Sequence, residues 1–172
     1  MNKRRVVITG LGIVSPVGNN VNDAWANIIN GVSGIAPITN IDTEIQAVKF
    51  GGAVKEFDVS QYLSPKEAKK MDIFIHYGMA AGIQAFEDSG IEVTDENAER
   101  IGVAIGAGIG GLTTIEKTAD LFREKGPKRI SPFFVPSSII NMVSGNMSIK
   151  FGLKGPNFAI VTACTTGTHN IG

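Results

Sequence analysis

The chain has 172 residues, and its 16 basic and 16 acidic side chains leave no formal net charge at neutral pH. The balanced charge gives no argument for nucleic-acid binding. The single cysteine excludes an internal disulfide framework. The apolar run after the basic start is too short for a signal peptide or a membrane span. We therefore expect one cytoplasmic domain, large enough to bury a core and independent of nucleic acid and membrane.

Residues 4–9 are mostly β-branched and apolar, which predicts a buried strand. A helix is expected next, with Asn20 or Asn22 as its N-cap and Gly31 at its end. Residues 48–54 predict a second strand, weakened by two consecutive glycines.

The segment Ser64–Glu67 has the features of a helix start. Serine is the capping residue, proline takes the first helical position, and glutamate three residues on completes a capping box. Asp72 then opens a longer helix that runs to about Ser89, because its apolar residues keep helical spacing. Residues 101–107 predict another strand.

Three further elements precede the cysteine. A helix is predicted over 112–125, with Thr113 or Thr114 as its cap. Residues 131–136 predict an aromatic loop between prolines, and residues 137–151 predict a helix with small residues that allow close packing. Strands alternate with helices along the chain, so the predicted class is α/β.

Cys164 lies between the apolar run 158–161 and a small, hydroxylated stretch, which predicts a strand-to-helix junction. The free amides and positive dipole at a helix start lower the pKa of a thiol there. They also stabilise an oxyanion on a thioester carbonyl under attack, with the Cys164 amide as one donor. A lone cysteine can equally be a small buried hydrophobe, so the residue pattern leaves both interpretations open.

Residues 106–111 contain a G-x-G-x-x-G motif between a predicted strand and a predicted helix. The acidic residue that would confirm a dinucleotide site about 20 positions later is absent, so we expect no such cofactor. His169 lies about 140° around a helix from Cys164, which predicts a structural contact rather than a general base. His76 is expected to be a hydrogen-bonded histidine of the core boundary, and two histidines with one cysteine offer no metal cluster.

Seven segments, taken together and in this order, resemble the β-ketoacyl-acyl-carrier-protein synthases, in particular the type II elongating enzymes of bacterial fatty-acid synthesis. They are Arg5–Gly12, Ser15–Gly18, Lys70–Asp72, Gly108–Gly111, Ile130–Pro136, Gly152–Pro156 and Thr162–Gly167. The resemblance implies a thiolase-like, layered α-β-α-β-α fold built from two similar halves. Family members are more than twice as long, so residues 1–172 would form most of the first half, and the C-terminal half would be absent.

The resemblance also implies a reaction. Cys164 would accept an acyl group from acyl-carrier protein, malonyl-carrier protein would lose CO₂, and the resulting carbanion would attack the acyl-cysteine. The implied partners are the acyl and malonyl carrier proteins and a second copy of the enzyme in a homodimer. Two histidines, a lysine and a gating phenylalanine of the family have no counterpart here, so we expect the 172-residue chain alone to be inactive.

Further site residues follow from the same resemblance. Ile109 matches a residue that lines the acyl tunnel, and Phe134 lies in a segment that reaches toward the partner's acyl pocket. The basic residues that match carrier-protein docking positions are Lys66, Lys69, Lys70, Lys128 and Arg129. The plainer alternatives are core aromatics and a solvated charged face. Two alternative functions stay open: a polyketide ketosynthase with the same chemistry, and an inert fragment or scaffold subunit.

Overall fold

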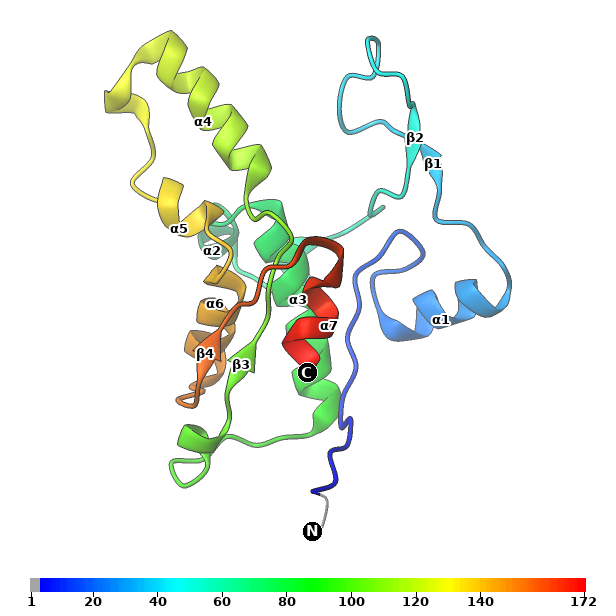
Figure 1. Ribbon diagram of the computed structural model, residues 1–172, viewed down its shortest axis with the longest axis vertical. Helices are drawn as coiled ribbons and strands as arrows, with labels where there is room; N and C mark the ends of the chain where they lie inside the picture. The colour runs from blue at the N-terminus through cyan, green and yellow to red at the C-terminus, as the bar shows by residue number, and fades with distance from the viewer. Residues whose placement is uncertain (1–3) are drawn as a thin grey trace. The chain divides into compact units, whose positions relative to one another are not determined.

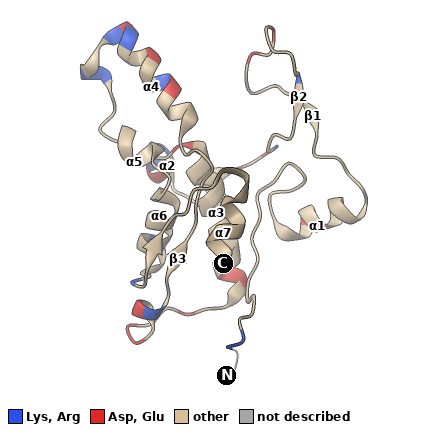
Figure 2. Cartoon of the chain, viewed as in Figure 1, with Lys and Arg blue, Asp and Glu red and all other residues tan. Residues whose placement is uncertain are grey.

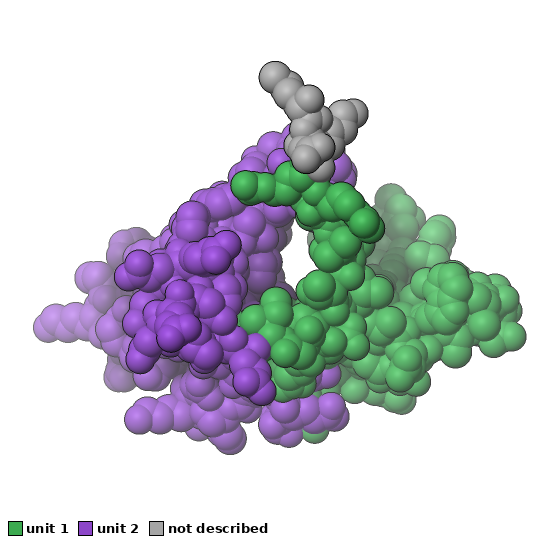
Figure 3. Space-filling model, turned by 90° about the horizontal axis from the view of Figure 1, so that it is seen from below, with its two compact units in different colours: residues 1–58, 80–91 green, residues 59–79, 92–172 purple. Residues whose placement is uncertain are grey.

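The computed structural model describes residues 4–172, so the first residues of the basic start lie outside the described part. The chain divides into two compact units, coloured separately in Figure 3. Unit 1 comprises residues 1–58 and 80–91, and unit 2 comprises residues 59–79 and 92–172.

Unit 1 contains helix α1 (Val21–Ile29) and a small antiparallel sheet of β1 (Ala36–Pro37) and β2 (Phe50–Gly51). Asn20 is the N-cap of α1, because its side-chain oxygen accepts a hydrogen bond from the Asp23 amide at 2.9 Å. The predicted helix is therefore confirmed with the first of its two candidate caps. The predicted second strand shortens to the two residues of β2.

Residues 4–9 do not form the predicted buried strand. They belong to neither of the two sheets found in residues 4–172, and Val6 and Ile8 are 90% and 83% exposed. A β-branched run favours an extended backbone, but a strand also needs a partner for its amides and carbonyls. The chain that follows this segment contacts the second half of α3 (Ile73–Ser89), where a Cβ on Gly12 would lie only 2.0 Å from the Ala81 carbonyl oxygen.

Unit 2 begins with η1 (Val59–Gln61) and helix α2 (Pro65–Ala68), which starts with the predicted capping box. The Ser64 amide donates to the Glu67 carboxylate at 2.9 Å, and the Glu67 amide donates to the Ser64 hydroxyl at 3.3 Å. The first part of α3 follows, with the side chain of Ile75 fully buried. His76 Nε2 lies 2.9 Å from the Ala68 carbonyl oxygen, which confirms the prediction of a hydrogen-bonded histidine.

The centre of unit 2 is a parallel pair of strands, β3 (Val103–Ala104) and β4 (Asn157–Phe158). Both are much shorter than the runs 101–107 and 158–161 that predicted them. Helix α6 (Met142–Phe151) packs against both strands (Figure 1). The fully buried hydroxyl of Ser144 in α6 lies 2.9 Å from the carbonyl oxygens of both Ile105 and Phe158, so it joins the two strands where they end.

The helix predicted over 137–151 is broken in the structure. Its first residues belong to α5 (Phe134–Ser138), which begins inside the predicted aromatic loop. The Ser138 hydroxyl donates to the Phe134 carbonyl oxygen at 2.7 Å. Such side-chain bonds compete with the helical backbone pattern, and Ile139 takes an extended backbone with ψ of 144°. The chain resumes a helix only at α6.

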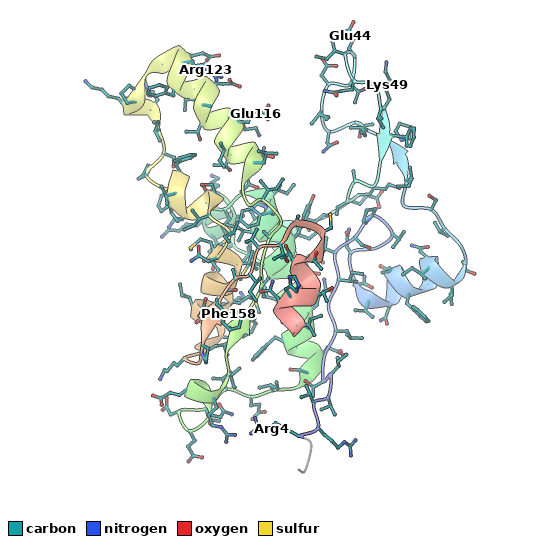
Figure 4. All side chains as sticks on the ribbon, in the orientation of Figure 1. Arg4, Glu44, Lys49, Glu116, Arg123 and Phe158 are labelled. Atoms are coloured by element: carbon teal, nitrogen blue, oxygen red, sulfur yellow. The ribbon has the colours of Figure 1, made fainter. Side chains whose placement is uncertain are left out.

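Helix α4 (Leu112–Lys125) has the predicted bounds, but its predicted cap is wrong. Gly111 is the N-cap and makes no side-chain bond, while the Thr114 amide donates to the distant carboxylate of Asp72. Every residue of α4 is half-buried or exposed, and Figure 4 shows the side chains of Glu116 and Arg123 on it.

The remaining short helices are η2 (Ala98–Arg100), η3 (Pro127–Arg129), η4 (Ala163–Thr165) and α7 (Thr166–Ile171). None of the helices in residues 4–172 is both long enough and apolar enough to cross a bilayer.

Candidate active site

Cys164 is exposed and lies in η4, between strand β4 and helix α7. Figure 1 shows the chain leaving β4, passing through this turn and entering α7. The predicted strand-to-helix junction is confirmed, and the reading of Cys164 as a buried hydrophobe does not hold. An accessible sulfur at such a junction is available to a substrate carbonyl.

Three threonines close the turn that contains Cys164. The Thr162 amide donates to the Thr166 hydroxyl at 3.0 Å, and the Thr165 amide donates to the Thr162 carbonyl oxygen at 3.1 Å. Ala163, directly before the cysteine, has a φ of 50°, which is the left-handed region that residues with a side chain rarely adopt. Such a conformation persists only where its surroundings hold it, so the turn fixes the backbone of the cysteine.

The side chain of Asn170 holds the strand that leads into this turn. Its oxygen accepts a hydrogen bond from the Ile160 amide at 3.2 Å, and its nitrogen donates to the Ile160 carbonyl at 3.0 Å. One amide side chain thus takes both backbone groups of Ile160, as a neighbouring strand would. Neither Asn170 nor Thr166 was expected from the sequence. The bonds of Asn170 depend on α7 folding back along the strand, and no sequence signal indicates this.

His169 of α7 also contacts this turn. Its Nδ1 lies 2.7 Å from the Thr162 hydroxyl, so the predicted structural contact is confirmed. This bond supports the threonine whose carbonyl and amide close the cysteine turn.

The glycine motif lies directly beside the cysteine turn. A Cβ on Gly106 would fall 2.0 Å from the Ile160 carbonyl oxygen, so only glycine fits there. Gly108 lies close to Ala163, with 3.8 Å between its ideal Cβ and the Ala163 carbonyl oxygen. The structure therefore brings the loop 106–111 and the cysteine turn together, and Ile109 in that loop is 69% exposed.

The other end of this loop contacts α5, which carries Phe134. The Gly111 amide donates to the Ser138 carbonyl oxygen at 2.9 Å. Phe134 itself is half-buried, whereas Phe133 is 42% exposed, so the pair does not form a buried aromatic core. The Lys70 ammonium lies 4.8 Å from the centre of the Phe133 ring, within the range of a cation–π interaction.

The five basic residues predicted for docking fall into two groups. Lys66 and Lys69 are exposed and Lys70 is half-buried beside α2, while Lys128 and Arg129 are exposed in η3. Helix α4, about 21 Å long from its 14 residues, runs from the Asp72 contact to η3. Figure 2 shows the basic residues of η3 at the far end of α4. Lys70 of the first group contacts the ring of Phe133, which follows η3 in the chain.

The residues that the structure describes include no group of three His, Cys, Asp or Glu side chains placed to bind a metal ion. The groups that the cysteine turn itself presents are one exposed thiol, backbone amides and hydroxyls.

Comparisons with known proteins agree on one family. Residues 3–172 match the sequence model described as "Beta-ketoacyl synthase, N-terminal domain". The whole chain is 61% identical to "3-oxoacyl-[acyl-carrier-protein] synthase 2" of Vibrio cholerae and 54% identical to the protein of that name from Coxiella burnetii. A third protein of that name, from Staphylococcus aureus, is 48% identical over 98% of the chain. The chain spans only 41–42% of the length of these relatives.

Two solved structures have the same fold. One is a ketosynthase in complex with its type II polyketide acyl-carrier protein, with a TM-score of 0.82 at 24% identity over 99% of this chain and 45% of that one. The other is a β-ketoacyl synthase from Burkholderia phymatum, with a TM-score of 0.80 at 23% identity over 98% of this chain and 42% of that one. The α/β, thiolase-like fold that the sequence predicted is thereby confirmed.

Proposed function

The chain belongs to the β-ketoacyl synthase family, whose N-terminal domain its residues 3–172 match, and from this membership we propose that its protein elongates fatty-acyl chains on acyl-carrier protein. The reaction is a decarboxylative condensation between an acyl group held on Cys164 and malonyl-carrier protein. The observation that carries the proposal is the exposed thiol of Cys164 in a turn that hydrogen bonds hold between β4 and α7.

The first step is acyl transfer to the enzyme. The Cys164 thiolate attacks the thioester carbonyl of acyl-carrier protein, and a new C–S bond forms at Cys164. The bond to the carrier sulfur breaks, and the carrier thiol leaves with a proton. The amide of Cys164 is our candidate donor to the oxyanion that develops on the carbonyl. The left-handed Ala163 and the Thr162–Thr166 bond orient this amide and the sulfur together.

The second step forms the new carbon–carbon bond. Malonyl-carrier protein loses CO₂, and the electron pair of the broken bond remains on the α-carbon. That carbon attacks the acyl-cysteine carbonyl, and the bond to Cys164 breaks to release the thiolate. The product, which is two carbons longer, remains on the carrier protein. Of the two histidines in this chain, His169 is bonded to Thr162 and His76 to Ala68. We therefore propose no decarboxylation role for either histidine.

The relatives' names support fatty-acid elongation over the polyketide alternative. The relatives that are 48–61% identical to this chain are named "3-oxoacyl-[acyl-carrier-protein] synthase 2", whereas the ketosynthase in complex with a polyketide acyl-carrier protein is 24% identical. The exposed cysteine in a strained turn favours an enzyme with a cysteine nucleophile over the scaffold alternative.

The partners and location are part of the same proposal. The acyl-carrier protein docks through the basic residues around α2 and η3, with charge complementarity increasing the rate of encounter. Phe134 and Ile109 contact the acyl chain, and a second copy of the protein completes a homodimer. We place the protein in the cytoplasm because a single free cysteine suits a reducing compartment.

The test is the intact mass of the purified full-length protein after exposure to acyl-carrier protein carrying a saturated acyl chain. We expect one acyl adduct, which Cys164→Ala abolishes. The matched control is His169→Ala, which removes a side chain of α7 that contacts the same turn without removing the nucleophile. It should keep the adduct and lose less than about tenfold in rate, whereas loss of a general base costs about 10²–10⁴-fold.

Two results would count against the proposal. An unmodified wild-type protein would support the scaffold alternative. An adduct that survives Cys164→Ala would assign the nucleophile to another residue. A turnover assay with malonyl-carrier protein on the full-length protein, beside the 172-residue chain alone, then separates acyl transfer from condensation.

A further inference from the structure

Asp72 is a buried carboxylate that joins two helices far apart in the sequence. It precedes α3 and is only 5% exposed. One of its oxygens accepts hydrogen bonds from the Thr114 amide at 2.8 Å and the Thr114 hydroxyl at 2.6 Å. The other oxygen accepts from the Phe74 amide at 3.2 Å. Asp72 therefore caps its own helix and, at the same time, the start of α4.

The chemistry of these bonds explains why this position holds an aspartate. Both carboxylate oxygens accept from backbone amides, and the amides belong to different helices. An asparagine has a single acceptor oxygen, so it can cap α3 or α4 but not both. A negative charge is also favoured next to two helix N-termini, where both macrodipoles are positive. Helix α4 has no capping side chain of its own, so Asp72 supplies the one that it lacks.

Asp72 also lies close to the hydrogen bonds that hold the end of the loop 106–111. Its backbone amide donates to the Ser137 carbonyl oxygen at 3.3 Å, and the Gly111 amide donates to the next carbonyl oxygen, that of Ser138, at 2.9 Å. The loop 106–111 enters α4 through Gly111 and ends three residues before Thr114. The end of the loop is thus held by α5 and, through Thr114, by Asp72.

The start of the same loop contacts the cysteine turn, through Gly106 against Ile160 and Gly108 against Ala163. A shift of α4 at Thr114 therefore moves a segment whose other end flanks Cys164. The loop carries one large apolar side chain, Ile109, and 69% of that side chain is exposed. Under the proposed function, Ile109 contacts the acyl group that is attached to the Cys164 sulfur.

We infer that Asp72 is a positioning residue that fixes the 106–111 loop beside Cys164, and that it thereby determines which acyl chain lengths the enzyme accepts. The inference rests on the proposed acyl transfer to Cys164. Asp72 touches neither substrate nor nucleophile, and it acts through Thr114 and the loop. Loss of its bonds to Thr114 lets α4 and the loop shift, which alters the room for long and short chains unequally.

The test compares variants of the full-length protein by the rate at which a short and a long saturated acyl chain are transferred from carrier protein to Cys164. Asp72→Asn removes one of the two caps, and Thr114→Val removes only the hydroxyl bond. The matched control is Asn20→Ala, which removes the side-chain cap of α1. A loss of stability alone lowers both rates together and leaves their ratio unchanged.

We expect the long-to-short ratio to change by about twofold to thirtyfold in Asp72→Asn. Thr114→Val should change it in the same direction by less, and Asn20→Ala should leave it at the wild-type value. The inference fails if the folded aspartate and threonine variants keep the wild-type ratio, or if the control changes the ratio equally. If Asp72→Asn does not fold, the ratio measured for Thr114→Val decides alone.

A second measurement separates this inference from the proposed function. Hydrogen exchange of the peptide covering residues 105–116 should quicken in Asp72→Asn, or in Thr114→Val if only that variant folds, and not in the control. If the wild-type protein accepts no acyl group, the proposed function fails. The hydrogen-exchange rates of this peptide then decide by themselves whether Asp72 positions the loop. Unchanged exchange throughout that peptide would overturn the positioning role.

Discussion

Gly106→Ala tests the contact between the glycine loop and the cysteine turn. The new Cβ would lie 2.0 Å from the Ile160 carbonyl oxygen, where ordinary contact begins at 3.4 Å, and 2.7 Å from the Asn170 side-chain nitrogen. The two segments must therefore separate by about 1.4 Å, which would also break the bonds between Asn170 and Ile160. Overpacking costs about 1–3 kcal/mol and each lost hydrogen bond about 1 kcal/mol, so we expect a destabilisation of about 3 kcal/mol or more.

The assay is a thermal melt together with the rate of Cys164 acylation. For a cooperative unit of 150–250 residues, about 3 kcal/mol lowers the melting temperature by about 6–12 °C. The matched control is Gly145→Ala in α6, where the nearest atom to a new Cβ is the Met142 sulfur at 3.8 Å. That substitution should stabilise the helix by about 0.5–1 kcal/mol.

Acylation should slow in Gly106→Ala even at temperatures where the protein is fully folded, because the cysteine turn moves with Ile160. The reasoning is refuted if Gly106→Ala has the same melting temperature as Gly145→Ala and is acylated at the wild-type rate. A slower rate with an unchanged melting temperature would mean that the loop yields at Gly106 without strain, and the packing argument would then be wrong.

Two further predictions concern charge. Lys69→Glu should lower the rate at which carrier protein acylates Cys164 by about threefold to tenfold at low salt. The effect should be small at high salt or with a carrier-free thioester. The matched control, Lys49→Glu in unit 1, should leave the rate unchanged. The hydrogen bonds from the Ser64 hydroxyl and amide hold the pKa of Glu67 below its ordinary value of 4.5. The stabilisation by this charged cap is therefore present above about pH 4.5 and is lost as the pH falls through the lower, folded-state pKa. In denaturation curves, the deficit of Ser64→Ala, about 1 kcal/mol at neutral pH, should shrink in acid, and a deficit independent of pH would contradict the assignment.

Local signals predicted the helices whose ends are set by neighbouring residues. The capping box at Ser64 and the helix from Asp72 to Ser89 are both confirmed. The cap of α4 could not be predicted, because its acceptor, Asp72, is 42 residues away in the sequence. The break at Ile139 was also missed, since the pattern of apolar residues does not show where serine hydroxyls bond the backbone.

The candidate site divides in the same way. Cys164 could be placed at a junction between strand and helix because composition changes abruptly there. The left-handed Ala163 and the bonds of Asn170 could not be predicted, because they depend on how α7 packs against the strand. The roles of Ile109, Phe134 and the basic residues came from the family resemblance and stay predictions.

The exposed segment 4–9 has a practical consequence for the handling of any polypeptide limited to these residues. It is rich in β-branched side chains and belongs to neither sheet of the described chain. Such a segment is a template for edge-to-edge association between molecules, and only the arginines at its start oppose this by repulsion. A preparation of residues 1–172 alone should therefore aggregate as its concentration increases.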